Sequence, residues 1–250
     1  MVEDFYDQLA PYYHLLYPDW QASIDRQAAG LGAVLTEFGV APGASILDAA
    51  CGIGTQCLGL AAVGYDVSAS DISIAAVRRA EDEAARRGLR IAFSVADLRE
   101  LSTGHTRRFD AVVVCDNAIP HLLSDAEILR ALKECRACLR LGGVLLISVR
   151  DYDRIERKTP DVRQHGSRTE SGREYYAEQE WRWDADQYDL LVRLIEEAPG
   201  APRRVHEFHS RYYAVGLATL ERLVLEAGFV RVERRDSFFF QPLLVGINAT

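Results

Sequence analysis

The sequence predicts an α/β protein with a doubly wound, seven-stranded sheet and helices on both faces. From residue 45 to residue 150, short apolar runs alternate with segments whose apolar residues recur at helical spacing. Glycines stand just past three of these segments, at Gly64, Gly88 and Gly142–Gly143, where a left-handed residue often ends a helix. This alternation is typical of right-handed βαβ units on a mostly parallel sheet.

Helices are expected at the start of the chain. Apolar and aromatic residues recur at helical spacing between Phe5 and Phe38, with an interruption at Pro18. The pattern predicts two or three helices that end before Pro42 and Gly43. We assign residues 1–40 to a helical lid.

The sheet and its helices follow in order. The expected strands are 45–49, 65–70, 90–95, 109–115 and 143–150, and the expected helices are 54–63, 73–87 and 124–140. Near the end of the chain, a helix at 216–227 precedes two strands at 230–234 and 238–247. Residues 41–151 and 206–250 should therefore form a Rossmann-like core whose last two strands make an antiparallel hairpin.

Between these two parts of the core the pattern changes. A polar stretch covers 154–172, and alternating runs follow at 174–183, 188–196 and 205–214. The first two runs are joined through residues 184–187 and predict a hairpin with one solvated face. We expect residues 152–205 to be a small antiparallel β insertion.

Composition narrows the functional class. The chain has 250 residues, 48% of them hydrophobic and 26% charged, which are ordinary values for a globular protein. No apolar run approaches the length of a membrane span, and the first residues lack the features of a signal peptide, so a cytoplasmic location is expected. The net charge of −8 disfavours a nucleic-acid surface, and a small-molecule partner is expected instead.

The cysteines give no sign of a metal site or of disulfides. Their number, five, is odd, and the Cys135-x-x-Cys138 pair lies in a helical pattern without a second pair to complete a zinc site. We therefore expect neither a metal nor disulfides.

The loop after the first strand predicts a ligand site. Residues 46–55 run from an apolar strand into a small-residue loop, in which Gly52 and Gly54 allow the backbone to approach a ligand closely. Cys57 stands where a pyrophosphate-binding G-x-G-x-x-G pattern needs its third glycine. The loop therefore favours a nucleoside without phosphates.

Three acids support this interpretation. Asp48, Asp71 and Asp97 each end or follow one of three successive strands. In an open α/β sheet, ligands bind at the carboxyl ends of the strands, where a carboxylate can accept hydrogen bonds from a ribose diol. Each acid could instead cap its own loop.

At this point the residues resemble those of class I S-adenosylmethionine-dependent methyltransferases. Three segments, 116–122, 149–153 and 210–213, are similar to the corresponding segments of glycine and sarcosine N-methyltransferases. The predicted insertion also falls where those enzymes have a small antiparallel substrate domain.

The resemblance implies S-adenosylmethionine as the cofactor and suggests how the chain holds it. Ala50 and the glycine loop would pack on the methionine part, Asp71 would bind the ribose hydroxyls, and Ile72 would lie against adenine. The implied cofactor-binding residues are Tyr6, Tyr17, Arg26, Asp48, Ala50, Gly52, Gly54, Asp71, Ile72, Asp97, Leu98, Cys115 and His121.

The resemblance also implies an acceptor site. Asn117 and Arg150 match positions that hold an amino acid, and these two with His121 are the expected catalytic residues. The tyrosines expected to bind the acceptor are Tyr176, Tyr212 and Tyr213. One departure is Asp116, which stands where the glycine enzyme has a glycine, and another is residues 174–176, which match only loosely.

Structural roles compete with several of these assignments. His121 could simply begin a helix, Arg26 could be an exposed helix charge, and any single tyrosine could pack in the core. Trp181 and Trp183 share one face of a strand, which favours packing of the insertion onto the sheet.

The sequence thus predicts methyl transfer to the nitrogen of a small amino acid or an amine bearing an acidic group. Such an enzyme needs chiefly to position a neutral nitrogen and exclude water, and an arginine fork suits an acceptor carboxylate. The alternatives are an O-methyltransferase of a bacterial specialised metabolite, with His121 as base, and a nucleoside-binding module without turnover. The acceptor, the number of methyl groups and the oligomeric state stay open, a homo-oligomer included.

Overall fold

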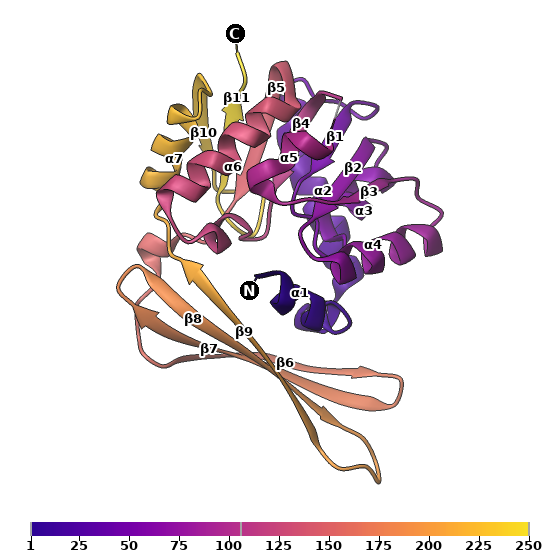
Figure 1. The fold of residues 1–250 in the computed structure, drawn as a ribbon. Helices are drawn as coiled ribbons and strands as arrows, with labels where there is room; N and C mark the ends of the chain where they lie inside the picture. The colour runs from indigo at the N-terminus through magenta and orange to yellow at the C-terminus, as the bar shows by residue number, and fades with distance from the viewer. Residues whose placement is uncertain (1, 106, 250) are drawn as a thin grey trace.

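A seven-stranded sheet with helices on both faces forms the core of the computed structural model, which describes residues 2–105 and 107–249 (Figure 1). Its strands are β1 (Ser45–Asp48), β2 (Asp66–Asp71), β3 (Ala92–Val95), β4 (Phe109–Val114), β5 (Leu139–Ser148), β10 (Arg231–Arg235) and β11 (Leu243–Ile247). They lie in the order β10-β11-β5-β4-β1-β2-β3, and β11 is antiparallel to both neighbours. The predicted α/β fold with a terminal antiparallel hairpin is confirmed.

Both faces of this sheet are buried. One is covered by α5 (Leu101–Gly104), α6 (Asp125–Cys138) and α7 (Leu217–Glu226), and the other by α2 (Trp20–Glu37), α3 (Thr55–Ala62) and α4 (Ile74–Arg86). In β1, Ile46 and Leu47 are each fully buried but belong to different core clusters. Successive side chains of a strand point to opposite faces, so the sheet separates two hydrophobic layers.

The N-terminal helices follow the predicted pattern. They comprise α1 (Val2–Leu9), the 3₁₀ turn η1 (Tyr13–Leu16) and α2, which begins after the N-cap Asp19. Figure 1 shows α1 between the core and the second sheet, and Phe5 and Leu9 are buried against that sheet. This segment therefore joins the two parts of the molecule.

The second sheet has four antiparallel strands. They are β6 (Asp161–Glu170), β7 (Arg173–Asp184), β8 (Gln187–Glu197) and β9 (Arg204–Tyr213), in sequence order. The predicted hairpin is β7–β8, in which Asp184 pairs with Gln187. Short 3₁₀ turns, η2 (Leu98–Glu100), η3 (Ile119–Leu122) and η4 (Tyr152–Arg154), complete the regular structure.

The structure departs from the expected elements in four places. Part of the polar stretch 154–172 forms β6, an edge strand whose side chains are largely exposed, so its sequence shows no buried alternation. β9 pairs with β8, so the second sheet extends beyond the expected boundary at residue 205. The last strand begins only at Leu243, directly after Pro242, which cannot donate a ladder hydrogen bond. Gly142 lies within β5, although its φ of 77° is left-handed.

In the described part of the chain, every helix is too short or too polar to cross a lipid bilayer. All five cysteines are buried free thiols.

Candidate active site

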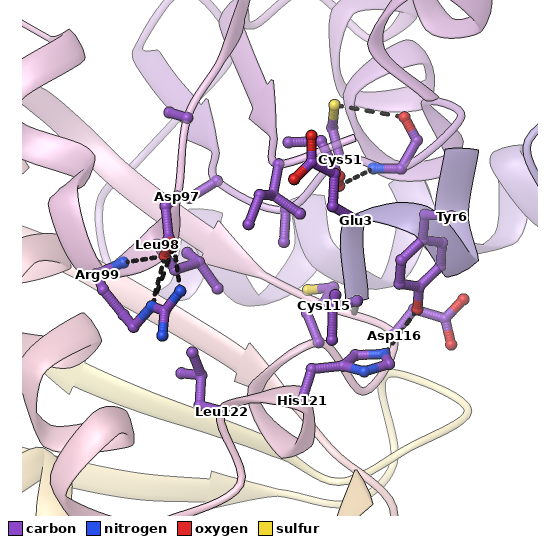
Figure 2. A pocket seen from close by; sticks show the side chains of 18 of the residues that line it. Glu3, Tyr6, Cys51, Asp97, Leu98, Arg99, Cys115, Asp116, His121 and Leu122 are labelled. Atoms are coloured by element: carbon purple, nitrogen blue, oxygen red, sulfur yellow. Dashed lines mark hydrogen bonds and ion pairs between the residues drawn. The ribbon is translucent and has the colours of Figure 1, made fainter. Parts of the chain in front are cut away.

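A cavity of about 660 Å³ opens at the carboxyl ends of the central strands, beneath the N-terminal helices (Figure 2). Figure 2 shows Asp97, Leu98 and Arg99 along one side of it and Tyr6, Asp116 and His121 toward another. The predicted site residues that line it are Tyr6, Tyr17, Ala50, Gly52, Asp71, Ile72, Asp97, Leu98, Cys115 and His121. The fold thus gathers residues from four strand ends and the lid around one space.

The loop from β1 to α3 forms the floor. Gly52 and Gly54 both have positive φ, 52° and 102°. A Cβ on Gly54 would lie 3.0 Å from Leu58 Cδ1, so this glycine permits close packing of the loop without itself lining the cavity. The Gly52 amide donates a 2.8 Å hydrogen bond to Asp71 Oδ2, which ties the loop to the end of β2.

Asp71 faces the cavity from β2. Its other oxygen, Oδ1, accepts a 2.9 Å hydrogen bond from the Ser73 amide. Burial raises the pKa of Asp71, and these backbone hydrogen bonds oppose the increase. The carboxylate is held in a fixed orientation with lone pairs to spare.

Asp97 has a different environment. Arg99 donates to both Asp97 oxygens, including a 2.5 Å contact from Nη2, and also donates to Glu127 Oε2 at 2.8 Å. Burial raises the pKa of Asp97, but the bonds from Arg99 outweigh it and leave the pKa below its ordinary value. Asp97 is therefore an ionised acid, fixed at the rim by an arginine that the sequence analysis did not single out.

Asp48 lies beneath the floor instead of lining the cavity. It is fully buried, and neither of its oxygens has a hydrogen-bond partner of normal geometry among the described residues. Burial, together with the nearby Asp71 charge, raises the pKa of Asp48 to about 7. This acid acts on the site through the loop above it.

Tyrosines of the lid close the cavity from the opposite side. Tyr6 OH and His121 Nε2 are hydrogen-bonded at 2.9 Å. Tyr17 OH donates to Asp116 Oδ2 at 2.8 Å. Tyr13 also lines the cavity and was not predicted; only its aromatic neighbourhood in the sequence could have indicated it.

His121 is held in an aromatic environment. Its ring lies 4.0 Å from the Tyr212 ring between centroids, and Tyr212 stacks in turn on Tyr188 at 5.2 Å. Burial, with a smaller contribution from the Arg150 charge, lowers the pKa of His121 to about 3. The imidazole is therefore neutral at physiological pH.

The loop after β4 contains two successive residues with left-handed backbone. Asp116 and Asn117 have φ values of 55° and 67°, a conformation that is costly for residues other than glycine and common at functional sites. Asp116 consequently lines the cavity, whereas Asn117 is buried away from it. Asn117 Oδ1 accepts from the Arg150 amide at 3.1 Å, so it positions the neighbouring loop.

Arg150 follows β5 and does not line the cavity. Its guanidinium carbon is 5.3 Å from the centroid of the Trp181 ring. Among the described residues, no carboxylate forms an ion pair with this half-buried guanidinium. The Asp116 charge interacts with this guanidinium without forming an ion pair with it, which leaves the guanidinium fork able to pair directly with an anionic group.

Several predicted residues lie elsewhere. Arg26 is exposed and donates to Ser23 Oγ. Tyr176 is 37% exposed and lines a separate hollow on the second sheet, and Tyr213 OH donates to Asp125 Oδ1. The predicted residues outside the cavity lining are Arg26, Asp48, Gly54, Asn117, Arg150, Tyr176, Tyr212 and Tyr213.

Comparison with known proteins shows what this chain is similar to. Residues 46–143 match the family described as "Methyltransferase domain". The chain is 32% identical over 163 residues to a glycine/sarcosine N-methyltransferase of Parasynechococcus marenigrum (strain WH8102), which covers 65% of this chain and 55% of that protein. It is also 32% identical over 149 residues to dTDP-3-amino-3,6-dideoxy-alpha-D-glucopyranose N,N-dimethyltransferase of Streptomyces fradiae. That alignment covers 58% of this chain and 54% of that protein. The chain thus spans about half the length of the curated relatives it matches.

A solved structure agrees over nearly the whole chain. The S-adenosylmethionine-bound amino pentose methyltransferase CalS10 from Micromonospora echinaspora superposes with a TM-score of 0.78 at 19% identity, over 91% of this chain and 92% of that one. The resemblance seen in the sequence is therefore confirmed. Residues 46–143 of this chain match a methyltransferase domain, and the chain has the fold of S-adenosylmethionine-dependent methyltransferase structures.

Proposed function

We propose that this protein transfers a methyl group from S-adenosylmethionine to the nitrogen of a small amino acid or an amine bearing an acidic group. The observation that supports it most is the single cavity that joins a nucleoside-type half to a half lined by Asp116 and His121. Its volume of about 660 Å³ lies within the range of small-molecule sites, about 300 to 1,000 Å³.

The residues of the first half fit the methyl donor. The Ala50–Gly52 backbone has space above it for the methionine part, since a Cβ on Gly52 would approach no atom closer than 3.7 Å. Asp71 would accept hydrogen bonds from the ribose hydroxyls, with Ile72 and Leu98 against the adenine. Bound there, the donor would supply a methyl carbon that a nitrogen lone pair can attack in line, with the sulfonium sulfur leaving as a thioether.

The acceptor half is suited to an amine with an anion. Arg150 has no carboxylate partner among the described residues, and a guanidinium fork matches a carboxylate in geometry and charge. The Arg150 charge lowers the pKa of His121 and also acts on Asp116, so Arg150 influences the cavity although it does not line it. For that reason an acceptor would reach the guanidinium only after neighbouring side chains move.

The state of His121 argues against it as the base of an O-methyltransferase. O-methylation of a hydroxyl needs a base beside the methyl carbon. A histidine with a pKa of about 3 is a weak base, and its Nε2 is already hydrogen-bonded to Tyr6. An amine, once neutral, needs no such base.

The decisive experiment uses the full chain with S-adenosylmethionine and a panel of acceptors, with the product analysed by mass spectrometry. The panel contains glycine, sarcosine, β-alanine and dTDP-3-amino-3,6-dideoxy-glucose. We expect an N-methylated product from an acceptor with an acidic group. An O-methylated product would contradict the proposal, and donor binding without any product would favour the binding module.

A further inference from the structure

One charged group in the cavity has no role in the donor site or in anchoring an acceptor anion. Asp116 lines the cavity, and its Oδ2 accepts a hydrogen bond from Tyr17 at 2.8 Å. Its Oδ1 has no hydrogen-bond partner among residues 2–105 and 107–249, and no cation forms an ion pair with it there. This carboxylate therefore has one oxygen available to a ligand.

The chain maintains this arrangement at an energetic cost. Asp116 and Asn117 both have left-handed backbone, which costs of order 1 to 3 kcal/mol for each residue. The Asp116 amide donates to Ser148 Oγ at 2.8 Å and the Asn117 amide to the Ser148 carbonyl at 3.1 Å, so β5 fixes the turn. The turn directs an acid into the site.

We propose that Asp116 binds the acceptor nitrogen as its ammonium form and accepts its proton at Oδ1. This inference rests on the proposed N-methylation and adds a residue that selects amines and prepares them. An N–H bond of the ammonium breaks, an O–H bond forms on Asp116, and the nitrogen keeps the lone pair that methyl transfer requires.

Burial makes this proton transfer feasible. In water a carboxylate is a much weaker base than an amine, but removal from water disfavours both charged partners. Burial raises the pKa of Asp116, while the Tyr17 hydrogen bond and the Arg150 charge partly oppose it. The titratable and charged groups that interact with Asp116 come from the lid, the residue after β4 and the loop after β5. They are Tyr6, Tyr13, Tyr17, Cys115 and Arg150.

Binding tests the first part of the proposal. The full chain, saturated with S-adenosylhomocysteine, is titrated with sarcosine and with methoxyacetate, which replaces the ammonium by an ether oxygen and keeps the carboxylate. Asp116→Asn should weaken sarcosine about 30-fold or more and methoxyacetate less than about threefold. Asparagine tolerates the left-handed backbone and is isosteric, so the fold should persist, which donor affinity checks. Asp82→Asn, an exposed acid on α4, is the matched control.

The pH dependence of kcat/KM for sarcosine tests the second part. The wild type should have a plateau near neutral pH and decline above the amine pKa, because it uses the ammonium with an ionised Asp116. In Asp116→Asn, kcat/KM should instead rise about tenfold per pH unit up to the amine pKa, because only the neutral amine reacts.

The possible failures are distinguishable. If the wild type N-methylates sarcosine or glycine and Asp116→Asn keeps the same affinity and pH profile, the role of Asp116 is wrong and N-methylation stands. If the wild type methylates neither amino acid, the amino-acid acceptor of the proposed function is contradicted and this inference with it.

Discussion

Residues of the same type in this site have different surroundings, and these surroundings decide their pKa values. The three acids at the ends of β1 to β3 illustrate this. Asp97 is paired with Arg99, Asp71 is held by two backbone amides, and Asp48 is buried with no partner of normal geometry in the part of the chain that the structure describes. Their pKa values therefore shift in different directions, and each acid has its own consequence for stability or binding.

Asp48 should make the ligand-free protein less stable as the pH rises. Its folded-state pKa of about 7 exceeds the unfolded value near 4, so the stabilisation is present below pH 4 and is lost as pH rises through 7. Between pH 5 and pH 8 the unfolding free energy should fall in the wild type, and in the Asp48→Asn variant this fall should be smaller by about 2 to 4 kcal/mol. Urea unfolding at the two pH values measures this, and equal losses in the two proteins would contradict the assignment.

Asp71 should control donor affinity. In Asp71→Ala the ribose hydroxyls lose a charged acceptor and the Gly52 amide loses its partner. We expect S-adenosylmethionine to bind about 30- to 1,000-fold more weakly, or about 2 to 4 kcal/mol. Calorimetry gives the Kd, with Asp82→Ala as control, and an unchanged Kd would remove Asp71 from the donor site.

Arg150 should control acceptor affinity alone. Arg150→Ala should weaken the binding of an acceptor carboxylate by about 2 to 5 kcal/mol. Arg150→Lys should retain part of this binding because it keeps the charge, and lose the rest because it lacks the bidentate fork. The KM for sarcosine and the donor Kd are measured together, with the exposed Arg78→Ala as control. A loss confined to the donor would contradict the anchor role.

At the scale of elements, the lid is held by a specific contact with the core. Asp7 Oδ1 on α1 accepts hydrogen bonds from Ser73 Oγ at 2.6 Å and from the Ala75 amide at 3.1 Å, at the start of α4. The same lid provides the three tyrosines that close the cavity. A contact distant from the reacting atoms should therefore influence the donor.

The Asp7→Ala variant tests this coupling. Loss of the contact should cost about 1 kcal/mol, similar to a helix cap, and weaken S-adenosylmethionine about five- to tenfold. Gln8→Ala, at an exposed position on the same helix, is the control. Equal donor affinities for all three proteins would show that lid position does not matter for binding.

At the scale of the whole molecule, α1 lies between the core sheet and the second sheet (Figure 1), and the cavity is lined by the core and by the N-terminal segment, with Tyr212 of the second sheet packed against His121. A ligand that contacts both the lid and the core should stabilise the folded protein as a unit. At about 100 times its Kd, S-adenosylmethionine should raise the Tm by about 5 to 10 °C. Thermal unfolding measures the shift, and the Asp71→Ala variant should show a clearly smaller one at the same concentration.

The sequence by itself determined the core and the edge of the sheet at which the cavity lies. Alternating apolar runs, helix-ending glycines and strand-end acids are local patterns, and in a parallel sheet the strand ends must meet at one edge. Asp71 and Asp97 could therefore be expected at one cavity before any contact was known, and both line it.

Only the tertiary structure decided the acceptor half. The left-handed turn at residues 116–117 directs Asp116 into the cavity and Asn117 away from it, which the order of two polar residues cannot reveal. Likewise β6 is a polar edge strand that forms through its pairing with β7, so the hydrophobic periodicity of its sequence did not predict it. Side-chain direction and edge pairing depend on distant parts of the chain, and for that reason these features required the folded molecule.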